Sequence, residues 1–158
     1  MTCGPMINRF KESVESVAGH CIVTTDAADC VKQILADVKA TRVATSDNAP
    51  NAKDIFGFDV GISNAQAGIA ETGTLVLDSA YERHRLVSLV PPVHIAIVNA
   101  SSIVETLAEA LALLRKDREI SPAVTFITGP SRTADIELTL AIGVHGPQQL
   151  YVIVDQSK

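Results

Sequence analysis

The sequence has no tryptophan, and all aromatic residues together make up only 4% of its 158 residues. Apolar residues nevertheless make up 47% of the chain. The core is therefore predicted to consist of Val, Ile, Leu and Ala rather than of large rings. A chain of this length is expected to form a single domain, residues 1–158, that is long enough to bury a substantial core.

The sequence also lacks segments that would carry it into a membrane. No apolar run approaches the roughly 18 residues that a membrane-spanning helix needs. The first residues, Met1 to Pro5, show no basic stretch followed by an apolar one, so no secretory signal is predicted. We therefore expect a cytoplasmic protein.

Basic residues, cysteines and metal-ligand patterns are scarce as well. The 13 Lys and Arg are outnumbered by 18 Asp and Glu, and a net charge of -5 argues against a nucleic-acid partner, which needs a basic face. Cys3, Cys21 and Cys30 fit neither a C-x-x-C motif nor a disulfide framework, so reduced thiols are expected. The four His show no metal-ligand spacing, and no metal site is predicted.

What the sequence does contain is an alternation of β-branched apolar runs with amphipathic helical patterns. Residues 5–18 and 27–38 are predicted to be helices, and residues 20–25, 41–45, 93–98, 123–127 and 150–154 to be strands. This alternation is typical of βαβ units. It predicts an α/β fold with a mostly parallel central sheet and helices on both faces.

The middle of the chain departs from this pattern. Residues 58–63, 67–71 and 74–78 are predicted to be strands with hardly any connection between the last two, which implies an antiparallel insertion in the sheet. Further on, Ser102 and Glu105 match a capping box, which predicts that a helix begins there and carries Ile103 and Leu107 on one face.

A candidate ligand site follows the apolar run at 123–127. Gly129 and Pro130 end that strand, and Ser131 and Thr133 favour the start of a helix, where free backbone N–H groups attract anions. Arg132 adds a planar fork of donors. These features predict that a small carboxylate or phosphate is bound by Gly129, Ser131, Arg132, Thr133 and Asp135. The alternative is an ordinary connection in which Ser and Thr only cap a helix.

A second cluster is formed by Glu71, Thr72, Gly73 and Thr74. A carboxylate beside a glycine turn and two hydroxyls could serve as a base or nucleophile, so Glu71 is a candidate catalytic residue and the other three are candidate ligand-binding residues. In the alternative interpretation the two hydroxyls only satisfy the turn and Glu71 is exposed.

Three of the four histidines fall into two groups. His145 lies between glycines on a loop with Pro147 behind it, which suits acid–base catalysis near neutral pH, although a structural hydrogen-bonded His fits the same pattern. His20 and His94 lie within apolar strands and are predicted to be packed or edge residues.

These motifs also resemble a known family. Residues 70–75, 89–95, 128–137 and 143–147 are similar to signatures of the LUD-domain family, of the lactate-utilisation protein C type, and the resemblance runs from about Phe10 to Val154. The G-P-S-x-T-x-D-I-E run followed by G-V-H-G-P is a specific pair of motifs.

The resemblance implies a three-layer α/β sandwich similar to the ribose-phosphate isomerase and CoA-transferase group. It also implies a role in oxidising L-lactate to pyruvate together with iron–sulfur partner subunits. Three cysteines cannot hold a four-cysteine cluster. Iron–sulfur clusters are therefore expected only in partner subunits, and no cofactor is expected in this chain.

Two classes of function stay open at this point. The first is an accessory subunit of an L-lactate-oxidising complex that binds a small carboxylate. The second is a stand-alone isomerase- or CoA-transferase-like enzyme for a phosphorylated or CoA-linked substrate, with Glu71 as base or nucleophile and Arg132 as anion clamp. In either class, the loops that hold Gly73, Arg132 and His145 are predicted to converge on one pocket at the carboxyl ends of the strands.

Overall fold

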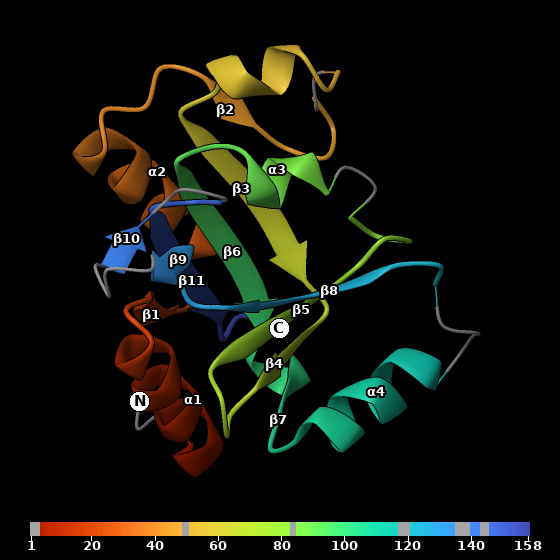
Figure 1. Cartoon of the computed structure of the whole chain (residues 1–158). Coiled ribbons are helices and arrows are strands. Elements are labelled where there is room, and N and C mark those ends of the chain that lie inside the picture. The colour runs from red at the N-terminus through yellow and green to blue at the C-terminus, as the bar shows by residue number, and fades with distance from the viewer. Residues whose placement is uncertain (1–3, 49–50, 83–84, 117–120, 135–139, 143–145) are drawn as a thin grey trace.

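The computed structural model describes residues 4–158 except for 49–50, 83–84, 117–120, 135–139 and 143–145. Its central sheet has five strands in the order β1-β11-β6-β3-β2, and every neighbouring pair is parallel (Figure 1). The strands are β1 (His20–Thr24), β2 (Val43–Ala44), β3 (Val60–Ala65), β6 (Val93–Asn99) and β11 (Gln149–Asp155). The β-branched runs therefore form the parallel sheet that their spacing predicted.

The strands in the middle of the chain form a second sheet. It has four strands in the order β7-β4-β5-β8, and β5 is antiparallel to both of its neighbours. The strands are β4 (Ala67–Ile69), β5 (Thr74–Asp78), β7 (Ile103–Val104) and β8 (Val124–Thr128). The prediction of an insertion within one sheet is wrong, because the chain turns out of the first sheet after Ala65 and the Gln66 N–H pairs with β5 at Val76.

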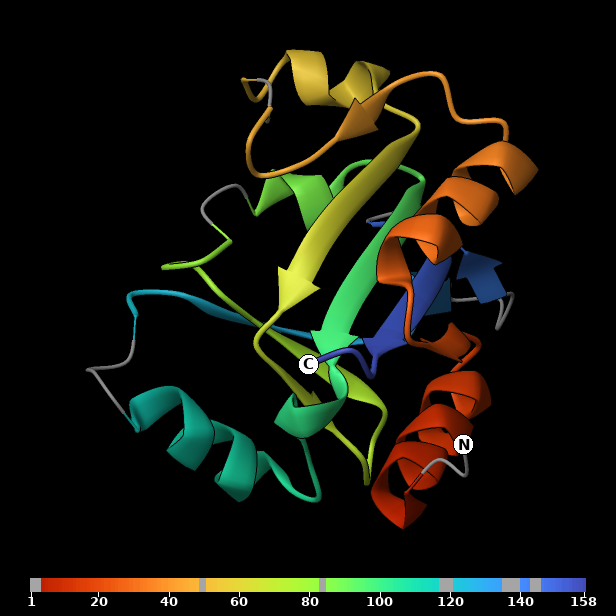
Figure 2. The same ribbon diagram turned by 180° about the vertical axis from the view of Figure 1, so that it is seen from behind.

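Helices cover both faces of the parallel sheet, as predicted. On one face α2 (Ala27–Asp37) packs Cys30 and Ile34 against β6 and β11 (Figure 2). On the other face lie α1 (Pro5–Ser16), the short α3 (Leu86–Leu89) and the second sheet, which α4 (Leu107–Arg115) covers in turn. A 3₁₀ turn, η1 (Asp54–Gly57), lies between β2 and β3. None of the described helices is long and apolar enough to cross a membrane.

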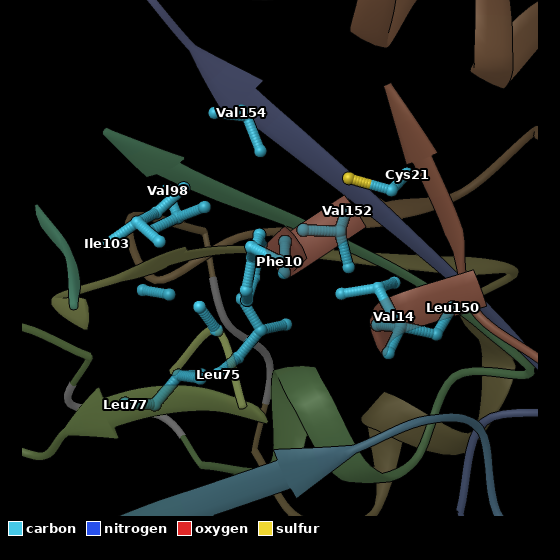
Figure 3. Packing of buried hydrophobic residues seen from close by; sticks show 13 residues of the cluster. Phe10, Val14, Cys21, Leu75, Leu77, Val98, Ile103, Leu150, Val152 and Val154 are labelled. Atoms are coloured by element: carbon cyan, nitrogen blue, oxygen red, sulfur yellow. The ribbon is translucent and has the colours of Figure 1, made fainter. Parts of the chain in front are cut away.

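The largest part of the core lies between the two sheets and α1. Phe10 and Val14 of α1 pack with Leu75 of β5 and Val152 of β11, and all four side chains are fully buried (Figure 3). Successive residues of β11 point to opposite faces, so Val152 belongs to this cluster while Ile153 packs toward α2. Among the described core residues, Phe10 is the one aromatic ring beside aliphatic side chains and two cysteines, in agreement with the composition.

The predicted capping box at Ser102 is wrong. Residues 100–102 form the short 3₁₀ turn η2 (Ala100–Ser102), and the next two residues form β7, which pairs with β4. The capping box belongs to Thr106 and Glu109 four residues later, and α4 begins there. Both segments match the same four-residue pattern, and the β-branched pair Ile103–Val104 favours the strand at the first one.

The described residues directly after Ser131 form a strand where a helix was predicted to begin. This strand, β9 (Arg132–Ala134), pairs with β10 (Leu140–Ile142) in an antiparallel arrangement. The Ser131 N–H donates to the Pro147 carbonyl at 2.8 Å, so it is not free for a ligand. The helix N-terminus that the sequence offered as an anion site is therefore replaced by a strand.

Candidate functional site

Two glycines place the signature loops at one end of the second sheet. Gly73 and Gly129 adopt φ values of 67° and 76°, in the left-handed region that favours glycine. A Cβ on Gly73 would lie 2.5 Å from the Val14 nitrogen, and one on Gly129 would collide with the Val17 carbonyl oxygen. Both turns therefore lie against the end of α1, where no side chain fits.

A chain of hydroxyls joins the two turns. Thr74 on β5 is directly opposite Thr128 on β8, and their Oγ1 atoms lie 2.7 Å apart. The Thr72 Oγ1 lies 2.7 Å from the Thr74 Oγ1 on the other side. The Glu-Thr-Gly-Thr motif and the Thr-Gly-Pro-Ser motif are thus held in register by side-chain hydrogen bonds between neighbouring strands.

A pocket of about 230 Å³ lies beside these three threonine hydroxyls. Its walls come from the end of β8 with the loop that follows, from α3, and from the starts of β6 and β11. The lining residues are Ser88, Leu89, His94, Thr125, Phe126, Ile127, Thr128, Gly129, Pro130, Ser131, Gly146, Pro147 and Leu150. Parts of three signature motifs that are distant in the sequence therefore form one cavity.

Close backbone contacts hold these walls together. The Val87 carbonyl of α3 sits so close to Gly61 that any Cβ there would collide with it, which brings α3 down onto β3. The Gln148 N–H donates to the Pro92 carbonyl at 2.7 Å and links the start of β11 to the start of β6. The pocket is thus fixed by main-chain packing of glycine and proline segments.

His94 is a polar residue of this site that the sequence did not single out as a ligand-binding candidate. The prediction that it is packed is confirmed, because it is only 1% exposed, and it is also one of the residues that line the pocket. Its Nε2 is hydrogen-bonded to the Ser63 hydroxyl, and its Nδ1 is buried without a hydrogen-bond partner among the described residues. Burial lowers the pKa of His94 from 6.5 to about 4, so the imidazole is neutral at physiological pH. The one available signal was a polar residue within an apolar strand, since such residues are costly to bury without a role.

The residues predicted to bind a ligand are only partly brought together. Gly129 and Ser131 line the pocket. Thr74 reaches its edge through the hydrogen bond to Thr128, while Thr72 and Gly73 stand one step further away.

Glu71 and Arg132 are not among the described residues that line the cavity. The side chains of Glu71 and Arg132 are exposed, although Arg132 directly follows Ser131. Thr133 is described only as part of the backbone of β9, and Asp135 and His145 lie outside the described residues. The roles of all five stay predictions.

The pocket lies at the amino ends of β6 and β11, where His94 and Leu150 are the second residues of their strands. The prediction placed it at the carboxyl ends of the strands, which holds for β8 but not for β6 and β11. The difference arises because β8 belongs to the second sheet, which runs across the first, as Figure 1 shows. A larger hollow of about 610 Å³ does lie at the carboxyl ends of β3 and β6, lined by Asn64, Gln66 and Asn99 among others, but none of the predicted site residues that the structure describes borders it.

The described residues do not suit an iron–sulfur cluster. Cys21 belongs to the core on one face of the parallel sheet and Cys30 to the core on the opposite face, so the two thiols cannot share one cluster. Within the described part of the chain, no group of three or more His, Cys, Asp and Glu is arranged to hold a metal ion.

The sequence matches the LUD domain over residues 36–154. A lactate utilization protein C of Bacillus subtilis is 40% identical over 109 residues, which cover 66% of this chain and 45% of that protein. An uncharacterized protein of Neisseria meningitidis serogroup B, NMB1437, is 38% identical over 150 residues, covering 91% of this chain and 64% of that protein. The chain thus spans less than two thirds of the length of these relatives.

A solved structure has the same fold. The crystal structure of a DUF162 family protein from Deinococcus radiodurans superposes with a TM-score of 0.73 over 98% of both chains, at 19% sequence identity. At this identity the likeness concerns the fold alone.

Proposed function

Because the chain belongs to the LUD-domain family, we propose that it acts in lactate utilisation, as a subunit of an iron–sulfur complex that oxidises L-lactate to pyruvate. We further propose that it binds a small carboxylate in the pocket between β8, α3 and the start of β11. The observation that carries the proposal is the identity of 40% to a lactate utilization protein C over 109 residues.

The pocket's size and lining suit such a ligand. A volume of about 230 Å³ is below the range of about 300–1,000 Å³ typical of drug-sized ligands, so a molecule of a few heavy atoms would fit. Leu89, Ile127 and Leu150 offer apolar contacts for a methyl group, while Ser131 and His94 offer polar ones. Arg132, next to Ser131 and exposed, would attract a carboxylate from the rim.

The electron-transfer step would take place elsewhere in the complex. Oxidation of L-lactate to pyruvate releases two electrons and two protons, and the clusters that accept the electrons would lie in partner subunits. This assignment agrees with the two described cysteines lying on opposite faces of the sheet. The complex is proposed to work in the cytoplasm.

Deleting the gene in the organism that carries it tests this proposal. We expect growth on L-lactate as sole carbon source to be lost, while growth on pyruvate continues. The wild-type gene should restore growth, and the exposed variant Ser16→Ala should restore it equally. Unimpaired growth of the deletion strain on L-lactate would contradict the proposal.

An activity assay on the purified chain, together with the growth of the deletion strain, distinguishes the proposed subunit from a stand-alone isomerase- or CoA-transferase-like enzyme. In that case the purified chain alone would turn over a phosphorylated or CoA-linked substrate, and Glu71→Gln would abolish the turnover. No turnover by the purified chain, together with the growth defect, favours the subunit.

A further inference from the structure

We propose that His94 donates a hydrogen bond from Nδ1 to a carboxylate or carbonyl oxygen of the ligand, and that Ser63 holds the imidazole in the tautomer that makes this possible. The proposal deepens the proposed function, on which it rests for the identity of the ligand. It assigns to His94 a direct contact with the ligand and to Ser63 a positioning role.

The buried Nδ1 of His94 lowers the stability of the folded protein as long as it has no hydrogen-bond partner. A buried polar atom without a hydrogen bond destabilises a folded protein, and such atoms call for an explanation. The Nδ1 of His94 is such an atom among the described residues, and His94 is one of the residues that line a cavity large enough for a small molecule. A ligand oxygen in that cavity would supply the missing partner.

The Ser63 hydroxyl fixes which ring nitrogen of His94 carries the proton. A neutral imidazole has one N–H donor and one acceptor nitrogen. The Ser63 hydroxyl is 2% exposed, and its hydrogen bond to the Nε2 of His94 is the one that the described structure gives its side chain. If Ser63 accepted this bond, its own hydroxyl proton would be buried without an acceptor. Ser63 therefore donates to Nε2, and the ring proton must lie on Nδ1.

Other polar groups of the pocket already have hydrogen-bond partners. The Ser88 hydroxyl donates to the Arg85 carbonyl at 2.9 Å, and the Thr128 hydroxyl is engaged with Thr74. The Ser131 N–H is bonded to Pro147. Among these groups His94 Nδ1 stands out as a buried donor with an unused proton. The pocket thus selects a ligand that presents an acceptor oxygen, as pyruvate does in both its carboxylate and its keto group.

The tautomer can be observed directly by NMR. In protein labelled with ¹⁵N-histidine, long-range ¹H–¹⁵N correlations distinguish a protonated ring nitrogen from an unprotonated one. The spectrum of His94→Gln identifies which of the four His is His94. If that variant does not fold, Ser63→Ala identifies the His94 signals instead, because the His94 ring loses its hydrogen bond to Ser63 and its resonances shift. We expect the proton on Nδ1 in the free protein, and a shift of its resonance on titration with pyruvate. The His20 signals, from a ring stacked on Tyr151, serve as the internal control.

The positioning role of Ser63 has its own readout. In Ser63→Ala the imidazole can exchange between tautomers, so the Nδ1–H population should fall and pyruvate affinity should drop roughly 5-fold, the size of one hydrogen bond. Ser16→Ala, an exposed serine on α1, should change neither quantity.

The outcomes separate this inference from the proposed function. A proton on Nε2 in the free protein, or His94 signals that stay fixed at every pyruvate concentration, would overturn the inference even if the deletion strain cannot grow on L-lactate. A pyruvate-dependent shift of Nδ1–H combined with normal growth on L-lactate would support the inference and refute the proposed function.

Discussion

The buried, neutral His94 makes the fold sensitive to mild acid. Its pKa is about 4 in the folded protein and 6.5 when the ring is in water, because burial disfavours the charged form. Unfolding therefore takes up a proton between these two values, and stability present above pH 6.5 is lost as the pH falls through this window. At about pH 4.5 the linkage relation gives a loss of roughly 2.5 kcal/mol relative to about pH 7.5.

Urea unfolding at a series of pH values measures this loss, with His94→Gln as the matched variant. The free energy of unfolding of the wild type should fall by about 2.5 kcal/mol more than that of the variant between about pH 7.5 and 4.5. Hydrogen bonds, chiefly from the Arg42 N–H to Asp59 and from Ser157 to Asp155, also lower the pKa values of these carboxyls from 3.8. The stability that these two carboxylates contribute is lost only at pH values below the range in which His94 takes up its proton. Equal slopes for the two proteins would refute the description of His94 as a buried neutral group.

Three further predictions follow from the geometry of the loops. Gly73→Ala should destabilise the fold by about 1–3 kcal/mol in thermal melts, because of its positive φ and the backbone that it faces. Gly4→Ala meets nothing within 4 Å and should cost less, about 0.5–1 kcal/mol, because Ala is a poorer N-cap of α1 than Gly. Thr74→Val should cost about 1–3 kcal/mol in urea unfolding because it leaves two hydroxyls without their shared partner, and an unchanged midpoint would show that water replaces it. Arg132→Ala should weaken pyruvate binding in calorimetry by about 1.5–3 kcal/mol with hardly any change in melting temperature, and the reverse pattern would make Arg132 structural.

The parallel sheet could be predicted because its signal is local. Strands such as β6 and β11 are continuous apolar runs, as strands buried on both faces must be, and the helical patterns between them have the period of a covered face. The second sheet was recognised only as a set of strands. Whether β5 joins one sheet or another depends on pairing with β8, which lies about fifty residues further along the chain, and no local pattern encodes that partner.

The candidate site was harder to predict than the fold, because it depends more on contacts between distant parts of the sequence. Gly73 and Gly129 predict turns, and both residues adopt positive φ values in the structure. The helix expected after Ser131 is a strand because its backbone pairs with β10, and a pairing of that kind outweighs a helix-start signal. His94 was correctly predicted to be packed, but the role that we propose for it depends on Ser63, on α3 and on the cavity, and these meet only in three dimensions.

A crystal structure of the protein co-crystallised with pyruvate is the most direct test of the claim that the pocket binds a small carboxylate. We expect pyruvate in the pocket beside Ser131, with one of its oxygens within hydrogen-bonding distance of the His94 Nδ1. Pyruvate bound instead in the hollow at the carboxyl ends of β3 and β6, beside Asn64 and Asn99, or an empty pocket at saturating pyruvate, would contradict it.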